Sequence, residues 1–195
     1  FHDFHTPVED KEFLAILRDI KSNKFEERIK SIRYAYHKGL DSKGDKLKKE
    51  LPAFTPSATF TNRRKLEFLT EYSGIAHLDL DNISVAELQE VRTKVDRCGY
   101  TFASFISPSG MGIKIFIRIN SSLSDHQQMI LQLMHYYQEL TGCEPDAKCK
   151  DVTRLCFVSW DEEMYLNEES EIFRPVLANQ EKLPSEKGIT PYNLD

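Results

Sequence analysis

The alternation of strand-like and helix-like segments in residues 73–160 restricts the possible folds more than any other feature of the sequence. Apolar runs bounded by turn-forming residues predict strands, and apolar residues at helical spacing behind serine caps predict helices. The expected elements are strand 74–81, helix 84–97, strands 101–107 and 113–119, helix 124–141, strand 153–159 and a short strand near 164–166. This β-α-β-β-α-β order predicts an α+β protein with the split βαβ core of ferredoxin-like and RRM-like domains. Helices are then expected on one sheet face, leaving the other face open.

The residues before this unit predict an N-terminal helical lobe. Thr6-Pro7-Val8-Glu9 resembles a capped helix start, which predicts a helix to about residue 22 and a second helix over 25–38. Prolines at positions 52 and 56 exclude a continued helix, and residues 57–61 resemble an edge strand. We divide the chain into an N-terminal helical segment (1–44), an α+β core (45–175) and a polar tail or linker (176–195).

Composition and charge limit the classes of partner. The chain has 195 residues, 40% of them hydrophobic, which is enough for one sizeable core. No apolar run reaches the roughly 18 residues of a membrane helix, so we expect a cytoplasmic protein with no membrane partner. The net charge of −5 is unevenly distributed: residues 18–65 hold 14 Lys or Arg against 6 Asp or Glu, and residues 161–195 hold 3 against 9. The basic segment could contact nucleic-acid phosphates, although a solvated helical surface has the same composition.

Two aspartates within strand 74–81 are the first candidates for a functional site. Side chains alternate across a strand, so Asp79 and Asp81 project from the same face, roughly 7 Å apart. Two carboxylates held in this way repel each other unless a cation lies between them, and oxygen ligands suit Mg²⁺ or Mn²⁺. The alternative is structural, with Asp81 and Asn82 beginning a turn that caps the following helix.

The hairpin loop and the strand after it carry further candidates. Ser109, Gly110 and Gly112 predict either a phosphate-binding nest of backbone N–H groups or an ordinary hairpin turn. In residues 113–119 the isoleucines occupy one face, and the other face is basic and aromatic. That second face consists of Lys114, Phe116 and Arg118. It is typical of a nucleotide or nucleic-acid platform, and equally of a half-exposed strand.

The connection before the last expected strand holds the remaining candidates. Asp146, with Asp151 as the alternative, could complete a metal triad with Asp79 and Asp81. Arg154 could bind a phosphate or pair with an acid on a neighbouring strand.

Four segments in this order resemble the VirE N-terminal domain family. They are Leu51-Pro52-Ala53-Phe54, residues 72–81, residues 107–114, and Asp146 with residues 153–157. The resemblance spans about residues 45–167, and the family is itself similar to archaeo-eukaryotic primases and primase-polymerases (AEP). It implies a primase-type core in which Asp79, Asp81 and Asp146 bind Mg²⁺ or Mn²⁺.

The resemblance also implies a nucleotide site and a cellular role. Ser109, Gly110, Gly112, Lys114 and Arg154 would then bind a nucleoside triphosphate. Lys114 stands where the primase motif usually has a histidine, a departure that nucleotide binding tolerates better than efficient polymerisation does. The family implies DNA replication in mobile or phage-derived elements, often with a fused helicase-like ATPase.

Three functions are therefore compatible with the sequence. The first is a metal-dependent nucleotidyltransferase of the primase-polymerase type, acting on a nucleoside triphosphate and on DNA or RNA. The second is a non-catalytic nucleic-acid-binding module that delivers a helicase-like ATPase. The side chains expected to contact nucleic acid are Lys48, Lys49, Arg63, Arg64, Phe116 and Arg118. The third is a ferredoxin-like protein with no nucleic-acid role, because fold alone never fixes function.

Overall fold

The computed structural model describes residues 3–174 as a mixed α+β protein, which confirms the α+β part of the predicted fold class. Its helices are α1 (Phe13–Lys21), α2 (Glu26–His37), α3 (Asp41–Lys49), α4 (Val85–Asp96) and α5 (His126–Thr141). Its strands are β1 (Ala53–Phe54), β2 (Ala58–Phe60), β3 (Leu69–Tyr72), β4 (Ile75–Leu80), β5 (Thr101–Ile106), β6 (Ile113–Arg118), β7 (Cys156–Phe157) and β8 (Tyr165–Leu166). The predicted tail, 176–195, lies outside the described residues.

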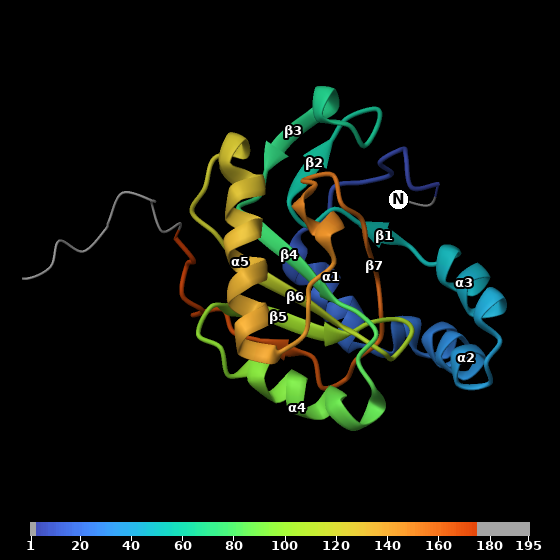
Figure 1. The fold of residues 1–195 in the computed structure, drawn as a ribbon. Coiled ribbons are helices and arrows are strands. Elements are labelled where there is room, and N and C mark those ends of the chain that lie inside the picture. Colours follow the sequence, from blue (N-terminus) through green and yellow to red (C-terminus); the bar gives the residue numbers. More distant parts are fainter. Residues whose placement is uncertain (1–2, 175–195) are drawn as a thin grey trace, which may run out of the picture.

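A four-stranded antiparallel sheet in the order β4-β6-β5-β8 forms the centre of the molecule (Figure 1). The predicted hairpin is confirmed, since β5 and β6 are adjacent and antiparallel. β4 also pairs antiparallel with β6, so β4 and β5 run parallel with β6 between them, and α4 connects them. After α5 the chain returns to the free edge of β4, where Pro145 forms an antiparallel bridge with Leu80.

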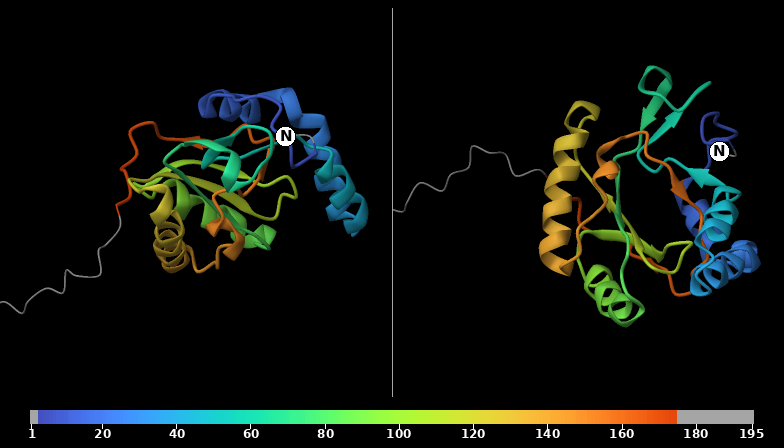
Figure 2. Two further views of the ribbon diagram at one scale, coloured as in Figure 1. Left: turned by 90° about the horizontal axis from the view of Figure 1, so that it is seen from above. Right: turned by 45° about the vertical axis from the view of Figure 1, so that its right-hand side comes forward.

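Helices cover both faces of the sheet, as Figure 2 shows from above. On one face α4 and α5 pack on the isoleucines of β6, including Ile113 and Ile115. On the other face α1 and α2 pack on phenylalanines of β5 and β6. The expectation of an open second face was wrong, because the apolar sides of α1 and α2 are buried against these aromatic side chains.

The N-terminal region differs from its sequence prediction in two places. The helix expected from Thr6 begins only at Phe13, and the Asp3 carboxylate instead accepts backbone N–H groups of His5 and Thr6 in a local turn. The sequence prediction also missed α3, whose Asp45 accepts a hydrogen bond of 2.6 Å from the Tyr36 hydroxyl of α2. The proposed boundary after residue 44 therefore falls inside a helix.

The strand expected over 153–159 is shorter than predicted, and it does not join the central four-stranded sheet. Only Cys156–Phe157 of this segment form a strand, β7, and it pairs with β1 in a separate two-stranded sheet through Ala53 and Phe157. The residues before it form a turn, because the Arg154 N–H donates to the Asp151 carbonyl at 2.8 Å. β8 takes the edge position beside β5. Within residues 3–174, no helix has the length and apolar character needed to cross a bilayer.

A buried histidine connects the start of α5 to β3 and makes stability depend on pH. His126 is 2% exposed, and its Nδ1 lies 2.9 Å from the Tyr72 hydroxyl. Burial lowers the pKa of His126, although Asp151 opposes this effect. The folded chain therefore takes up this proton at a lower pH than the unfolded chain does.

We expect the free energy of unfolding to decrease as the pH falls through the ordinary histidine range, about 6.5, because the unfolded chain then binds the additional proton. Urea denaturation at pH 7.5 and pH 5.5 would measure this loss. The variant His126→Gln should lose less stability between the two pH values than the wild type. An equal loss in both proteins would contradict the assignment to His126.

Candidate metal centre and basic cleft

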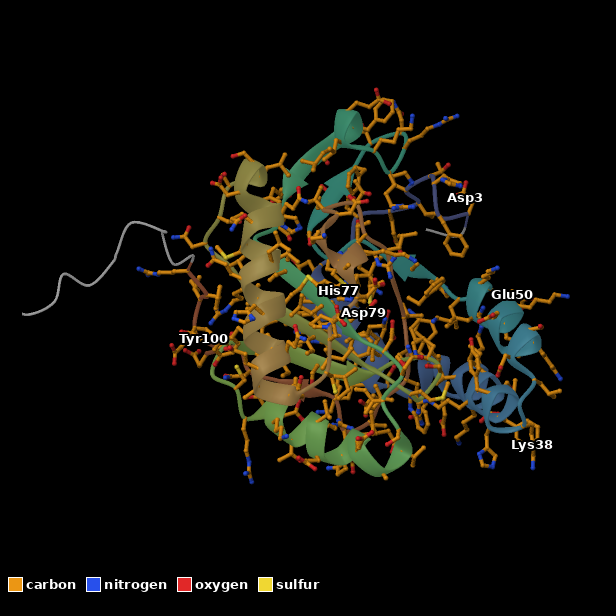
Figure 3. The ribbon with its side chains drawn as sticks, in the orientation of Figure 1. Asp3, Lys38, Glu50, His77, Asp79 and Tyr100 are labelled. Carbon is orange, nitrogen blue, oxygen red and sulfur yellow. The ribbon has the colours of Figure 1, made fainter. Side chains whose placement is uncertain are left out.

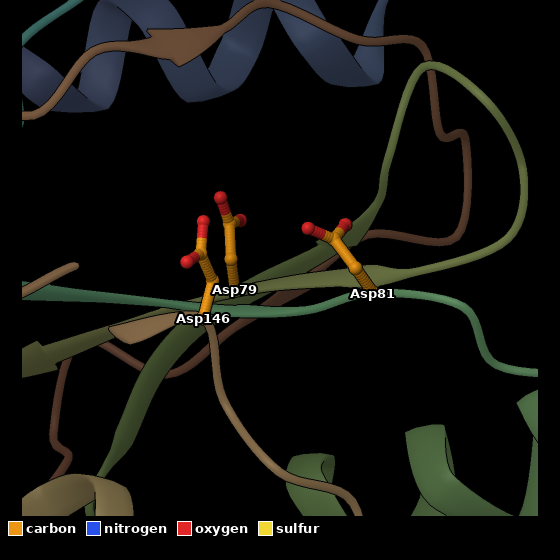
Figure 4. Close-up of side chains that lie close together, drawn as sticks. All are labelled: Asp79, Asp81 and Asp146. Atoms are coloured by element: carbon orange, nitrogen blue, oxygen red, sulfur yellow. The ribbon is translucent and has the colours of Figure 1, made fainter. Parts of the chain in front are cut away.

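Three carboxylates meet at the end of β4. One oxygen from each of Asp79, Asp81 and Asp146 lies within 4.8 Å of the others, and all three side chains project to the same side of the sheet (Figure 4). Asp79 and Asp81 share this side because side chains alternate along the strand. Asp146 joins them because its backbone N–H donates to the Asp79 carbonyl at 2.8 Å, next to the bridge between Pro145 and Leu80. The three residues grouped by the sequence analysis therefore lie together.

Of the structural alternative for Asp81, the turn is present, since Asn82 has a φ of 58°, but the helix cap is wrong. The cap of α4 is Ser84, whose hydroxyl accepts the Glu87 N–H at 3.3 Å. Asp81 is exposed, and among the described residues none donates a hydrogen bond to its carboxylate. Its oxygens are therefore the most accessible of the three.

Asp79 is buried in contact with a lysine. It is 2% exposed, and the 6% exposed Lys114 is its cross-strand partner in the register of β4 and β6. The Lys114 ammonium contacts Asp79 Oδ1. Burial would raise the pKa of Asp79, but Lys114 and His77 hold that pKa well below its usual range. Burial would lower the pKa of Lys114, and Asp79 instead raises it. Both groups are therefore charged over the whole neutral range.

Arg154 forms the second ion pair of the cluster. Its Nη2 lies 2.7 Å from Asp146 Oδ2 and 3.7 Å from Asp79 Oδ2. The other Asp146 oxygen accepts the Lys148 N–H at 3.0 Å, at the start of a 3-10 turn. Asp151, the alternative third carboxylate, accepts the Thr153 N–H and hydroxyl in its own turn and is not in the cluster.

The sequence analysis missed His77, which lies directly behind Asp79. The two labelled side chains lie close together in Figure 3. His77 Nε2 is 3.3 Å from Asp79 Oδ1 without hydrogen-bond geometry, and neither ring nitrogen has a hydrogen-bond partner among residues 3–174. Its ring stacks on Phe116 with centroids 5.1 Å apart. The alternation that grouped Asp79 with Asp81 also places His77 on their face, so the signal was present.

Asp79 and Asp81 line a cleft of about 650 Å³. Its basic lining residues are Lys48, Lys49, Arg64, Lys114, Lys148 and Arg154, and its acidic ones are Asp45, Asp79, Asp81 and Asp151. Phe4 and Phe157, also in the lining, pack edge to face at 5.4 Å. Arg64 connects two walls by donating to the carbonyls of Phe4, at 2.8 Å, and Thr153, at 2.6 Å. The excess of basic side chains favours a polyanionic ligand.

The hairpin loop approaches the end of β4 through Gly112. The N–H of Gly110 donates to the Ser107 carbonyl at 2.9 Å, and the N–H of Met111 lies 3.3 Å from Ser109 Oγ. These two groups of the predicted nest are thus already bonded within the loop, and Ser109, Gly110 and Gly112 all lie outside the lining of the cleft. A Cβ on Gly112 would lie 2.4 Å from the Leu80 carbonyl oxygen, so only glycine lets the loop approach β4 this closely.

The residues expected to contact nucleic acid divide into two groups. Lys48, Lys49 and Arg64 line the cleft. The remaining three are Arg63, Phe116 and Arg118. Arg63 is exposed in the turn before β3, outside the cleft lining. Phe116 is fully buried beneath aromatic rings, so it offers no face to a base. Arg118 lies at the opposite end of β6 and donates to Ser170 Oγ at 3.1 Å.

Residues 46–166 match the family model described as the BT4734-like, N-terminal domain. The chain belongs to this family. Comparison with curated proteins and with solved structures found no match. The three clustered carboxylates, His77, Lys114 and Arg154 all lie within the BT4734-like domain, whereas Phe4, α1 and α2 precede it.

We expect Asp79→Asn to destabilise the protein by about 3–5 kcal/mol, because it leaves the Lys114 ammonium buried without its partner. The matched variant Asp81→Asn should change stability by no more than about 0.5 kcal/mol, since the Asp81 carboxylate is exposed and unpaired. Urea denaturation at pH 7 in the presence of a chelator measures both. Equal effects of the two substitutions would contradict the buried ion pair.

Gly112→Ala should destabilise the protein by about 1–3 kcal/mol, because the added methyl group meets the backbone of β4, which cannot move freely. The matched control is Gly99→Ala, whose Cβ would meet only the flexible Glu171 side chain, at 3.1 Å. Thermal unfolding of the two variants should show a loss for Gly112→Ala that clearly exceeds the loss for Gly99→Ala. The reverse order would show that the loop has room to move.

Proposed function

We propose that this protein is the nucleotidyl-transferring domain of a primase-like enzyme that uses Mg²⁺ or Mn²⁺ held by Asp79, Asp81 and Asp146. The observation that carries the proposal is the meeting of these carboxylates within 4.8 Å beside a cleft with six basic side chains. Hard divalent cations prefer such oxygen ligands and share the phosphates of a substrate. When bound, the metal would lower the pKa of an attacking 3′-hydroxyl and neutralise the leaving pyrophosphate.

The chain's own residues would position a triphosphate and a nucleic-acid strand. Arg154 orients Asp146 and, being about one third exposed, could also reach a phosphate. Lys48, Lys49 and Lys148 supply positive charge along the cleft, which attracts a polyanion without defining its sequence. Burial lowers the pKa of Lys48, and the charge of Lys114 lowers it further, so an incoming phosphate would relieve this repulsion.

The strand arrangement supports a ferredoxin-like core for the proposed enzyme. In that fold two parallel strands flank an antiparallel one, as β4 and β5 flank β6. The bridge between Pro145 and Leu80 stands where a fourth strand would run. The similarity to VirE N-terminal domains and to archaeo-eukaryotic primases belongs to the same proposal. The proposal also includes a role in cytoplasmic DNA replication of a mobile or phage-derived element, together with a helicase-like ATPase.

A second function is favoured by the two ion pairs of the cluster. Lys114 and Arg154 already neutralise much of the charge of Asp79 and Asp146, as expected of a module that binds nucleic acid without catalysis. Such a module would hold a strand along the basic cleft and deliver a helicase-like ATPase to it. It requires no metal, and its binding should weaken steeply with salt.

Incorporation of labelled nucleotides into primed DNA and RNA templates, with Mn²⁺ or Mg²⁺, tests the enzymatic proposal. We expect Asp81→Asn to abolish incorporation while remaining folded, because the substitution removes an accessible metal ligand and no buried partner. The matched control is Asp45→Asn, which lies in the cleft outside the cluster and should keep its activity. Undiminished activity in Asp81→Asn would reject the proposed metal site.

Strand binding in the presence of a chelator tests the second function. Metal-independent binding that weakens as salt rises, with no incorporation under any condition, would favour the non-catalytic module. An isotherm insensitive to ionic strength would count against it.

A further inference from the structure

The Asp79 carboxylate is already bound by cations of the protein itself. The Lys114 ammonium contacts Oδ1 across the β4–β6 pair, and the side chains of Lys114 and Asp79 are 8% and 3% exposed. The guanidinium of Arg154 lies 3.7 Å from Oδ2. Each Asp79 oxygen therefore has a positive charge of the protein beside it.

Asp81 and Asp146 are placed differently. Asp81 is exposed and, within residues 3–174, receives no hydrogen bond or salt bridge. Asp146 is half-buried: its Oδ2 pairs with Arg154, and its Oδ1 accepts the Lys148 N–H at 3.0 Å. These two side chains are the accessible part of the cluster, where an ion could keep several of its waters.

The charge of the cluster is suited to one divalent ion. The three carboxylates and the two cations in contact with them, Lys114 and Arg154, sum to a formal charge of −1, without counting Lys48, whose charge also interacts with Asp79 and Asp81. One divalent ion brings this charge to +1, and a second would bring it to +3. An ion at Asp79 Oδ1 would also stand next to the Lys114 ammonium, where like charges repel strongly away from water.

His77 provides a second ligand beside Asp79. The residue is 2% exposed, and both ring nitrogens lack a hydrogen-bond partner among the described residues. Its Nε2 lies 3.3 Å from Asp79 Oδ1, the same oxygen that Lys114 contacts. An imidazole nitrogen next to a carboxylate oxygen forms a donor pair that suits Mn²⁺ better than Mg²⁺.

We infer that, in the absence of substrate, Lys114 takes the place of a metal ion at an inner position formed by Asp79 and His77, so that the substrate-free protein binds a single exchangeable divalent ion at Asp81 and Asp146. The inference rests on the proposed metal site. It adds how many divalent ions the site binds and identifies Lys114 as the residue that limits this number. Lys114 is here a positioning residue, since it acts through Asp79. Replacing its charged group by a neutral one opens the inner position to a second ion.

Counting bound Mn²⁺ per chain by calorimetry and by electron paramagnetic resonance tests this inference. The wild-type chain should bind one ion and Lys114→Gln two, with the additional ion held more tightly as Mn²⁺ than as Mg²⁺. The matched control Lys49→Gln removes a lysine from the same cleft without touching Asp79, and should bind as many ions as the wild type. Adding His77→Phe to Lys114→Gln should remove the additional ion.

The outcomes separate the inference from the proposed function. An unchanged ion count in Lys114→Gln overturns the inference whatever the wild type binds, and two ions in the wild type overturn it as well. No bound ion in the wild type overturns the proposed metal function.

Lys114→Gln also leaves Asp79 buried without its partner, so its folding depends on the ion. Refolding that succeeds only with Mn²⁺ supports the inference, because an inner ion would restore the missing charge. Failure to fold both with and without Mn²⁺ overturns it.

Discussion

The antiparallel register between β4 and β6 sets Asp79 opposite Lys114 and His77 opposite Phe116. A slip of one residue would turn Asp79 and Asp81 into the core beneath α5, and would expose Leu78 and Leu80 to the cleft. The register is secured on the other face, where Leu78, Leu80 and the isoleucines of β6 share one core with α4 and α5. The geometry of the charged cluster is therefore fixed by apolar packing on the opposite side of the same strands.

The sheet face that carries the three carboxylates is aromatic at one end and charged at the other. Towards the far end it is aromatic, with Phe116 buried between Phe13, Phe54 and Phe105, and α1 lies over it. Towards the end of β4 it becomes charged and opens to the cleft. His77 stands between the two regions, stacked on Phe116 and directed at Asp79. The N-terminal segment thus contributes to the site in two ways, by burying the aromatic half and by supplying Phe4 to one cleft wall.

Patterns within short segments of the sequence predicted the features that short segments determine, such as the face of a strand from which each side chain projects. Alternation placed Asp79 and Asp81 on one face, and the same rule places His77 there, although a single histidine in a strand does not by itself indicate a site. Asp146 could be chosen over Asp151 only from the bridge that joins its segment to β4, a contact between residues far apart in sequence. The prediction of an exposed sheet face for binding nucleotide or nucleic acid was wrong because it, too, depends on contacts between distant residues. Nothing in the pattern of residues 113–119 says that α1 will cover Phe116, because that depends on how distant elements pack.

The buried ion pair has consequences for the choice between the two proposed functions. Pairing Asp79 with Lys114 costs desolvation of two charges, and a well-packed apolar pair would often be as stable or more stable. Stability alone therefore does not account for charged groups at this position. In the proposed enzyme Asp79 would exchange its partner when substrate arrives, because a triphosphate would offer the Lys114 ammonium stronger acceptors than one carboxylate. A binding module needs no such exchange, and its Lys114 would remain on Asp79 whatever ligand fills the cleft. The two functions thus differ in whether this one contact is released.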